Sequence, residues 1–319
     1  MKNLCILLLS LCPLAAAADD FVEWVGANSG VNWSAGEIQA EGAGVGPANA
    51  PATTARLMAC RAAVVDAQRN LLESIQGVRV EGTTIVSDMM VESDVIKSSV
   101  DGVLRGARMV DRKPMDDGTC LVQMTAPLGG QFASNVYDRV FNPTQSTAAA
   151  NLIGRLLDQG LAVLVPAARA AENTLPAWQA SIDSLSTRLS ALEDLLSTHP
   201  AVVATADTSP TGLVLDARGS NFIPSMSPKI RKLRAGIIYP NSTQQSTRQE
   251  RGQLVSLFTR DLDTARRHPV VGDRPIVLKG LRTFGDTRTE IVLGTEAGER
   301  LEKLVGDGFL DDAGVIIVL

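Results

Sequence analysis

The segment from Pro51 to Gly77 limits the possible folds of this chain more than any other. Its apolar residues recur at three- and four-residue steps, the spacing that places side chains on one face of an α-helix. That face comprises Leu57, Cys60, Val64, Ala67, Leu71 and Ile75. Thr53 or Thr54 is expected to cap the start of the helix, and Gly77 to end it in the left-handed conformation. Short alternating or β-branched runs, VNWSAGEIQAEG and VRVEGTTIV, flank the segment. The pattern therefore predicts a helix packed on a small sheet.

The remaining patterns predict an α+β fold, with two small α+β domains joined by a mainly helical segment. The chain has 319 residues and 45% hydrophobic content, enough for two cores. We expect a signal peptide at 1–18, an N-terminal α+β domain at 19–142, a helical segment at 143–199 and a C-terminal α+β domain at 200–319. A net charge of −5 without a basic block disfavours nucleic acid as a partner.

The first residues have the order of a secretory signal peptide. Lys2 precedes the apolar run from Leu4 to Leu14, and small residues follow to Ala18. Cleavage near Ala18 would deliver the chain to the periplasm. Two alternatives are a buried N-terminal helix and a lipoprotein acylated at Cys12, although bulky Leu11 stands where lipoprotein signals place a small residue.

After removal of the leader, Cys60 and Cys120 are the cysteines that stay in the chain. Cys60 lies on the apolar face of the predicted helix, and Cys120 alternates with Val122 and Met124 on one face of a predicted strand. The two residues either form a disulfide or stay as separate buried thiols. A bridge would contribute about 3–4 kcal/mol by the chain-entropy model. Two distant cysteines without clustered histidines give no metal-ligand set.

Other N-terminal elements follow from local signals. Ser93 to Leu104 is a one-sided helix closed by Gly106, and Ala107 to Leu128 is a β-hairpin with the turn PMDDG. The stretch Gly42 to Gly46 superficially matches a glycine-rich nucleotide motif. It lacks the later glycine and the acidic residue of that motif, so we interpret it as a connector.

The segment 143–199 contains a heptad pattern that is typical of a helix packed along another helix. The pattern comprises Trp178, Ile182, Leu185, Leu189, Leu192 and Leu196. Packing within the chain and packing between subunits both remain open. Replacement of Leu185 and Leu189 by Asp, followed by a mass measurement in solution, would test this seam as an oligomer contact.

The C-terminal part reads as a second α+β domain. Strands are expected in TGLVLDARG, IRKLRAGIIYPN, PIVLKGLR, TEIVLG and GVIIVL, and helices in LDTARR and from Thr295 to Val305. The basic residues Lys229, Arg231, Lys232 and Arg234 are expected to face solvent. The polar run NSTQQSTRQERGQ is expected to be a mobile loop.

The sequence shows no catalytic constellation, and we predict no catalytic, cofactor-binding or metal-binding residue. His199 and His268, each followed by Pro, have no Ser or Cys nucleophile beside them in sequence. The pairs Asp116–Asp117 and Asp311–Asp312 suit turns or caps. Asp216 and Arg218 suit either an ion pair at the end of a strand or a turn.

Two regions resemble a known family. The run ARLMACRAAVVDAQRNLLESIQGVRVEG, the segment SDVIKSSVDGVLRGARMVD and the hairpin DDGTCLVQMTAPL resemble the LPP-type bacterial envelope lipoprotein family, whose domain also occurs in the flagellar proteins FlgP and FlgT. TGLVLDARG, ARRHPVVGDRPIVLKGLR and TEIVLG resemble the C-terminal part of longer members. The resemblance implies a periplasmic or outer-membrane-associated component, such as a ring around the flagellar motor, and transfers no site residue.

The expected function is therefore non-catalytic assembly or interaction in the cell envelope. The expected partners are the protein itself and other envelope or flagellar motor proteins, with peripheral association at the outer membrane. One alternative is a periplasmic binding module for a small ligand or a peptidoglycan fragment, which would need a deep pocket with convergent polar groups. The other is a hydrolase, which would need a nucleophile beside His199 or His268 in the fold.

Overall fold

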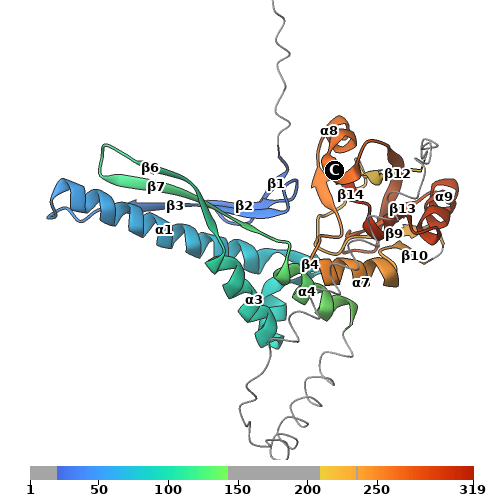
Figure 1. Cartoon of the computed structure of the whole chain (residues 1–319), viewed down its shortest axis with the longest axis horizontal. Helices are drawn as coiled ribbons and strands as arrows, with labels where there is room; N and C mark the ends of the chain where they lie inside the picture. The colour runs from blue at the N-terminus through green and yellow to red at the C-terminus, as the bar shows by residue number, and fades with distance from the viewer. Residues whose placement is uncertain (1–19, 143–208, 235) are drawn as a thin grey trace, which may run out of the picture. The chain divides into compact units, whose positions relative to one another are not determined.

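A computed structural model describes residues 20–142, 209–234 and 236–319. The predicted signal peptide, the helical segment with its seam from Trp178 to Leu196, and His199 lie outside the described residues. The described residues up to Phe141 and those from Pro210 onward belong to one compact unit, which contains two main sheets (Figure 1).

The N-terminal sheet is antiparallel and has the strand order β1-β2-β3-β7-β6. Its strands are β1 (Val22–Trp24), β2 (Ser29–Asn32), β3 (Glu37–Val45), β6 (Arg108–Pro114) and β7 (Thr119–Pro127). In β3 and β7 every second residue is buried, for example Ile38 in β3 and Val122 in β7, because one face of the sheet packs against the long helix α1 (Ala52–Gly77). The predicted helix and the predicted hairpin are therefore present.

Helix α1 lies unusually close to β3 because both surfaces are made of small residues. A Cβ atom at Gly42 would lie 2.2 Å from the backbone nitrogen of Ala67, and one at Gly44 would lie 2.1 Å from the carbonyl oxygen of Ala59. Only glycine permits this approach. The connector predicted at Gly42 to Gly46 is therefore wrong over most of its length, because those glycines belong to β3 as far as Val45.

Three details predicted for α1 differ from the structure. The helix begins after Pro51 without a side-chain cap, so Thr53 and Thr54 lie within its first turn. Gly77 does not adopt a left-handed conformation. It is the last helical residue, and it makes room for Val25, whose Cγ1 would lie 2.6 Å from a Cβ at this position.

The apolar face of α1 is also rotated from the predicted one. Ala59 and Ala63 are buried together with Cys60, Ala67, Leu71 and Ile75, whereas Leu57 is 56% exposed and Val64 only half-buried. The close contact with the glycines of β3 explains the difference, because it admits alanine and leaves no space for larger side chains. Cys60 and Cys120 form the disulfide that was one of the two predicted outcomes.

The other N-terminal elements follow α1 or the hairpin. A short β4–β5 ribbon (Arg79–Glu81 and Thr84–Ile85) leads to α2 (Val86–Glu92) and α3 (Asp94–Arg105), and α4 (Gln131–Phe141) follows β7. Gly106 ends α3, as the sequence predicted, whereas Ser93 lies just before the helix and caps it with its side chain. Helices α2 and α4 were not predicted.

The C-terminal sheet is mixed and has the strand order β10-β9-β13-β12-β8-β14-β11. Its strands are β8 (Gly212–Asp216), β9 (Lys229–Lys232), β10 (Ile237–Tyr239), β11 (Leu257–Thr259), β12 (Pro275–Phe284), β13 (Glu290–Leu293) and β14 (Val315–Val318). Its helices are α7 (Ser242–Arg251), α8 (Leu262–Arg267), η1 (Pro269–Val271), α9 (Thr295–Gly306) and α10 (Phe309–Asp312). The central strands β12, β8, β14 and β11 run parallel to one another, and β8 and β14 are buried along their whole length, as strands covered on both faces are.

Two predictions for this half are wrong. The polar run Asn241 to Gln253 is not a mobile loop, because it contains α7, which Asn241 and Gln244 stabilise through reciprocal capping hydrogen bonds. Of the four basic residues expected to face solvent, Arg234 is exposed, whereas Lys229, Arg231 and Lys232 are half-buried, and Lys232 pairs with Glu302. The ammonium group of Lys229 pairs with Glu81, and the guanidinium of Arg231 lies 3.6 Å from the centroid of the Phe284 ring.

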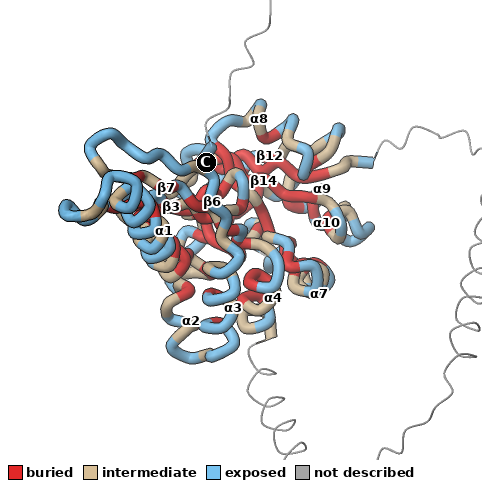
Figure 2. Tube along the Cα trace, turned by 60° about the vertical axis from the view of Figure 1, so that its left-hand side comes forward, coloured by how far each residue is buried: buried red, intermediate tan, exposed pale blue. Residues whose placement is uncertain are grey.

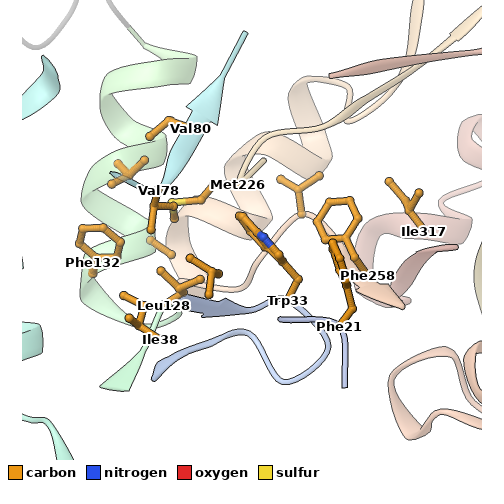
Figure 3. Close-up of a cluster of buried hydrophobic side chains, with 14 of the residues drawn as sticks. Phe21, Trp33, Ile38, Val78, Val80, Leu128, Phe132, Met226, Phe258 and Ile317 are labelled. Atoms are coloured by element: carbon orange, nitrogen blue, oxygen red, sulfur yellow. The ribbon is translucent and has the colours of Figure 1, made fainter. Parts of the chain in front are cut away.

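Buried side chains join the two sheets into one core. Trp33 of the N-terminal part packs edge-to-face on Phe258 at a centroid distance of 5.4 Å, and Figure 3 shows both rings in one apolar cluster with Phe21 and Ile317. The hydroxyl of Tyr137 in α4 donates to the carbonyl of Met226 and accepts from the N–H of Val255. The fold is α+β, as predicted, and apolar packing and hydrogen bonds join the two halves of the unit.

Candidate interaction surface

A large hollow lies between the first half of α1 and β6. It is an open groove of about 950 Å³, which we call the basic groove. Its apolar lining comes from Leu57, Val64 and Val65 of α1 and from Met109 of β6. Leu57 and Val65 are each 56% exposed and Met109 46% exposed. Figure 2 shows exposed residues along this part of α1 and the neighbouring hairpin. Large apolar side chains gathered in this way mark interaction sites more often than ordinary surface.

The charged residues of the basic groove are all arginines. Arg56, Arg61 and Arg112 line it, and among the described residues no Asp or Glu does. None of the three guanidinium groups forms an ion pair with a described residue, although other surface arginines, such as Arg108 with Glu37, do so. The groove therefore combines apolar area with positive charge that the described part of the chain leaves uncompensated.

Strand β6 is the edge of its sheet, but its sequence discourages the addition of another strand. The register against β7 shifts between Met109 and Asp111, and Pro114 has no N–H to donate. Charged Arg112 and Lys113 also lie on this edge. Bulges, prolines and charges are the usual protection of sheet edges. A partner of the basic groove is therefore expected to contact its side chains rather than to extend the sheet.

A second surface, on α2 and α3, has an excess of negative charge, although Lys97 and Arg105 of α3 are also exposed. Four exposed carboxylates lie on it, and we call it the acidic surface; its residues are Asp88, Glu92, Asp94 and Asp101. Val91 and Val95 stand among them, 83% and 60% exposed. A hollow of about 730 Å³ beside α3 is lined by small side chains of that helix and by the start of α4. Two of the carboxylates have basic neighbours, Lys97 for Asp94 and Arg139 for Glu92.

His268, the histidine within the described residues, is not part of a nucleophile–base pair. Its Nδ1 accepts the N–H of Val270, and burial lowers its pKa. Ser34 lines the same small hollow, of about 220 Å³. The Ser34 hydroxyl donates to the carbonyl of Phe258 and accepts from the N–H of Phe21, so it joins the two sheets and makes no hydrogen bond to His268. The arrangement lacks the contact that a serine hydrolase needs.

Asp216 forms an ion pair with Arg218, one of the two alternatives that the sequence allowed. The guanidinium of Arg218 contacts both of its carboxylate oxygens at 2.8 and 2.9 Å, and the ammonium of Lys279 lies 3.1 Å away. The Arg218 guanidinium holds the pKa of the Asp216 carboxyl well below its usual range. A permanently ionised carboxylate with both oxygens engaged fixes the end of β8 and is unsuited to proton transfer at neutral pH.

A buried arginine lies at another hollow, of about 460 Å³, and is a candidate for ligand binding. Arg248 is 4% exposed there. Its two terminal nitrogens donate to Gln253 and to the carbonyl of Ala313. These two donors are used within the protein, whereas the buried Nε of Arg248 has no hydrogen-bond partner among the described residues.

The carboxylate pairs predicted in turns do lie at turns and helix ends. Asp117 accepts from the N–H and hydroxyl of Thr119, which closes the hairpin turn and lowers the pKa of Asp117. Asp311 accepts from Gln244, and Asp312 pairs with Arg251. Within the described ranges no group of three or more His, Cys, Asp and Glu side chains could hold a metal ion. No described helix is long and apolar enough to cross a membrane.

The comparisons with known proteins divide the chain into two regions. Residues 33–125 match the model of the LPP20 lipoprotein family. This match covers β3, α1, the disulfide and most of the hairpin, so it includes the basic groove, and it supports the resemblance to an envelope lipoprotein family. Residues 212–319, which form the C-terminal sheet, match the model of the second domain of Treponema pallidum Tp0624. No curated protein sequence matches the chain.

Sequence reasoning did not find the basic groove. Leu57 and Val64 fit the apolar periodicity of α1, so the sequence predicts both of them in the core. The signal that could have located the groove is the alternate spacing of Gly42 and Gly44 in β3 and of Gly46 just after it. Glycine at alternate strand positions predicts close contact with small helix residues, which places the larger residues of α1 outside that contact.

Proposed function

We propose that this protein is a non-catalytic component of the bacterial cell envelope that works by binding other proteins through its basic groove. The match of residues 33–125 to an envelope lipoprotein family supports the location, and that family is not a known enzyme family. The groove itself supports the mode of action. In its more specific form, the proposal is a ring component around the flagellar motor.

The composition of the basic groove carries the proposal. Arginine and methionine are enriched in protein interfaces, and arginine is frequent among the residues that contribute most to binding. Covering Leu57, Val65 and Met109 would remove apolar area from water at about 25 cal/mol per Å². A protein partner supplies both apolar side chains and carboxylates. The open form of the groove suits such a partner better than a small ligand, which usually needs an enclosed pocket.

The expected partners are other copies of this chain and further envelope or motor proteins. Export through the leader ending near Ala18 would place the groove in the periplasm. Peripheral association with the outer membrane is compatible with this location. Acylation of Cys12 is the alternative route to the membrane.

Site-specific photo-crosslinking in cells tests the proposal. A photo-reactive residue at Leu57 is expected to capture an envelope protein, since this exposed side chain lies in the groove. The same residue at Gln123, exposed on β7, is the matched control because it points to the opposite face of the sheet from Val122. Recovery of the chain outside the envelope fraction, or equal capture at both positions, would refute the proposal.

The flagellar form has its own test. Deletion of the gene is expected to abolish or strongly reduce swimming, and expression of the wild-type chain is expected to restore it. A Leu57→Asp chain should be exported at the normal level and fail to restore swimming. Normal swimming of the deletion strain would exclude the flagellar role and leave the wider envelope role standing.

A further inference from the structure

We propose that the partner in the basic groove is a second copy of this chain, which docks through its acidic surface. The inference rests on the proposed function and names its partner. The contact would be head-to-tail: Arg56, Arg61 and Arg112 of one copy would face the carboxylates of α2 and α3 of the next copy.

The charges of the two surfaces are complementary. The basic groove is lined by three arginines without a carboxylate, whereas the acidic surface presents Asp88, Glu92, Asp94 and Asp101. The carboxylates of Asp94 and Glu92 stay accessible in the free chain, with side chains 95% and 67% exposed even in their ion pairs. Opposite charge on two surfaces steers association and fixes its orientation.

The apolar parts of the surfaces are also matched. Val91 and Val95 project from the acidic surface among its carboxylates. Leu57, Val65 and Met109 lie among the arginines of the groove. Each surface therefore offers exposed apolar side chains, and the charge of the carboxylates is opposite to that of the arginines. An apolar centre with a charged rim is the common form of a protein interface.

The two surfaces lie at different ends of α1, so they contact different neighbours. The groove is lined by residues 52–65, in the first half of the helix, whereas α2 and α3 follow its last residue. Figure 1 shows the start of α1 beside the hairpin turn and α3 towards the other end of α1. A contact between two unlike surfaces repeats from copy to copy. It generates a closed ring or an open filament rather than a two-fold dimer.

A membrane with anionic lipids would also suit a groove that is basic and apolar. Binding to a membrane would leave the acidic surface without a role. The negative charge of the acidic surface would also oppose approach to anionic lipids. A second copy uses both surfaces, and we therefore favour it.

Charge reversal in the purified full chain tests the inference. Arg61→Glu and Asp94→Arg are each expected to weaken self-association by about tenfold or more, measured by sedimentation equilibrium. The chain with both substitutions is expected to recover most of this loss, because each reversed surface then meets a reversed partner. Arg69→Glu and Glu250→Arg, at exposed positions outside both surfaces, are the matched controls and should associate like the wild type.

Three results would overturn the inference. Single variants that associate like the wild type would exclude these surfaces as the contact, and a double variant weaker than both single variants would exclude their pairing. Binding to phosphatidylglycerol vesicles that is lost with Arg61→Glu and kept with Asp94→Arg, without self-association, would assign the groove to a membrane. Capture of a different envelope protein at Leu57 would refute the second copy and leave the proposed function intact.

Discussion

At the scale of single residues, a few buried polar groups connect the two halves of the described unit. Tyr137 belongs to α4 but bonds to backbone groups of Met226 and Val255 at 2.8 and 3.1 Å. Burial raises the pKa of this tyrosine, so its hydroxyl remains a proton donor at neutral pH. Ser34 makes a similar connection to Phe258. These contacts explain why two regions with separate family matches form one unit.

Tyr137→Phe is expected to reduce the free energy of unfolding by about 1–3 kcal/mol, because the carbonyl of Met226 and the N–H of Val255 would then be buried without partners. The measurement is urea denaturation followed by circular dichroism. Ser246→Ala is the control, since that exposed hydroxyl bonds only within α7. An unchanged midpoint for Tyr137→Phe would show that the hydroxyl does not support the contact.

Asp216 is predicted to make stability depend on pH at the acidic end. Because its pKa is lowered in the folded state, its stabilisation is fully present above the unfolded value of about 3.9 and is lost as the pH falls towards the folded value. Asp216→Asn should cost about 1.5–3 kcal/mol at neutral pH, the range for hydrogen bonds to charged groups.

The check is chemical denaturation of both chains at neutral pH and at low pH. The difference between wild type and Asp216→Asn should shrink as the pH falls below about 4, because the wild-type carboxyl is then increasingly protonated in the unfolded state. A difference that stays constant between the two pH values would contradict the role given to Arg218 and Lys279.

At the scale of elements, the contact between α1 and β3 determines the N-terminal half. Gly44→Ala would place a Cβ 2.1 Å from the carbonyl oxygen of Ala59 and 2.5 Å from the nitrogen of Ala63. The helix must then move away from the sheet, and the expected cost is about 1–3 kcal/mol or more. Gly102→Ala in α3 is the control, because nothing lies within 4 Å of its Cβ and it should stabilise the chain by up to about 1 kcal/mol. Equal thermal midpoints for the two variants would rule out the close contact.

The disulfide joins α1 to β7, the strand that pairs with β3. Replacement of Cys60 and Cys120 by Ser is expected to reduce the free energy of unfolding by about 3–4 kcal/mol, since the bridge joins residues separated by 60 positions. A reducing agent should lower the stability of the wild type by a similar amount and leave the double variant unchanged. A wild type insensitive to the reducing agent would indicate that the bridge does not form in solution.

Elements with a clear apolar period or clear turn residues could be predicted from the sequence. The helix at α1, the hairpin of β6 and β7, and the strand β8 are examples. Helix α7 could not be predicted in this way, because its buried residues are the polar Gln244 and Arg248. It is stabilised by capping and by contacts with residues distant in sequence. The rotated face of α1 was missed because periodicity counts apolar residues and ignores how closely a glycine-lined strand can approach.

At the scale of the whole molecule, the described surfaces are better suited to binding another protein than to catalysing a reaction. Within the described ranges, the carboxylate pairs, Asp216 and His268 that the sequence singled out lie in ion pairs, turns and caps. The groove between α1 and β6 has arginines and apolar side chains that no described residue covers, and the acidic surface lies on other elements of the same unit. The sequence predicted an interaction protein from the absence of a reactive motif, but it could not locate the surface, since that surface depends on the packing of α1.

Sedimentation of the purified chain over a series of concentrations, with and without Leu57→Asp, tests the central claim most directly. Leu57 is exposed, so the substitution should leave the fold and its circular dichroism unchanged. The wild type is expected to shift from monomer to larger species as its concentration rises, and the variant to remain monomeric. A wild type that is monomeric at every concentration, or a variant that assembles equally well, would contradict assembly through the basic groove.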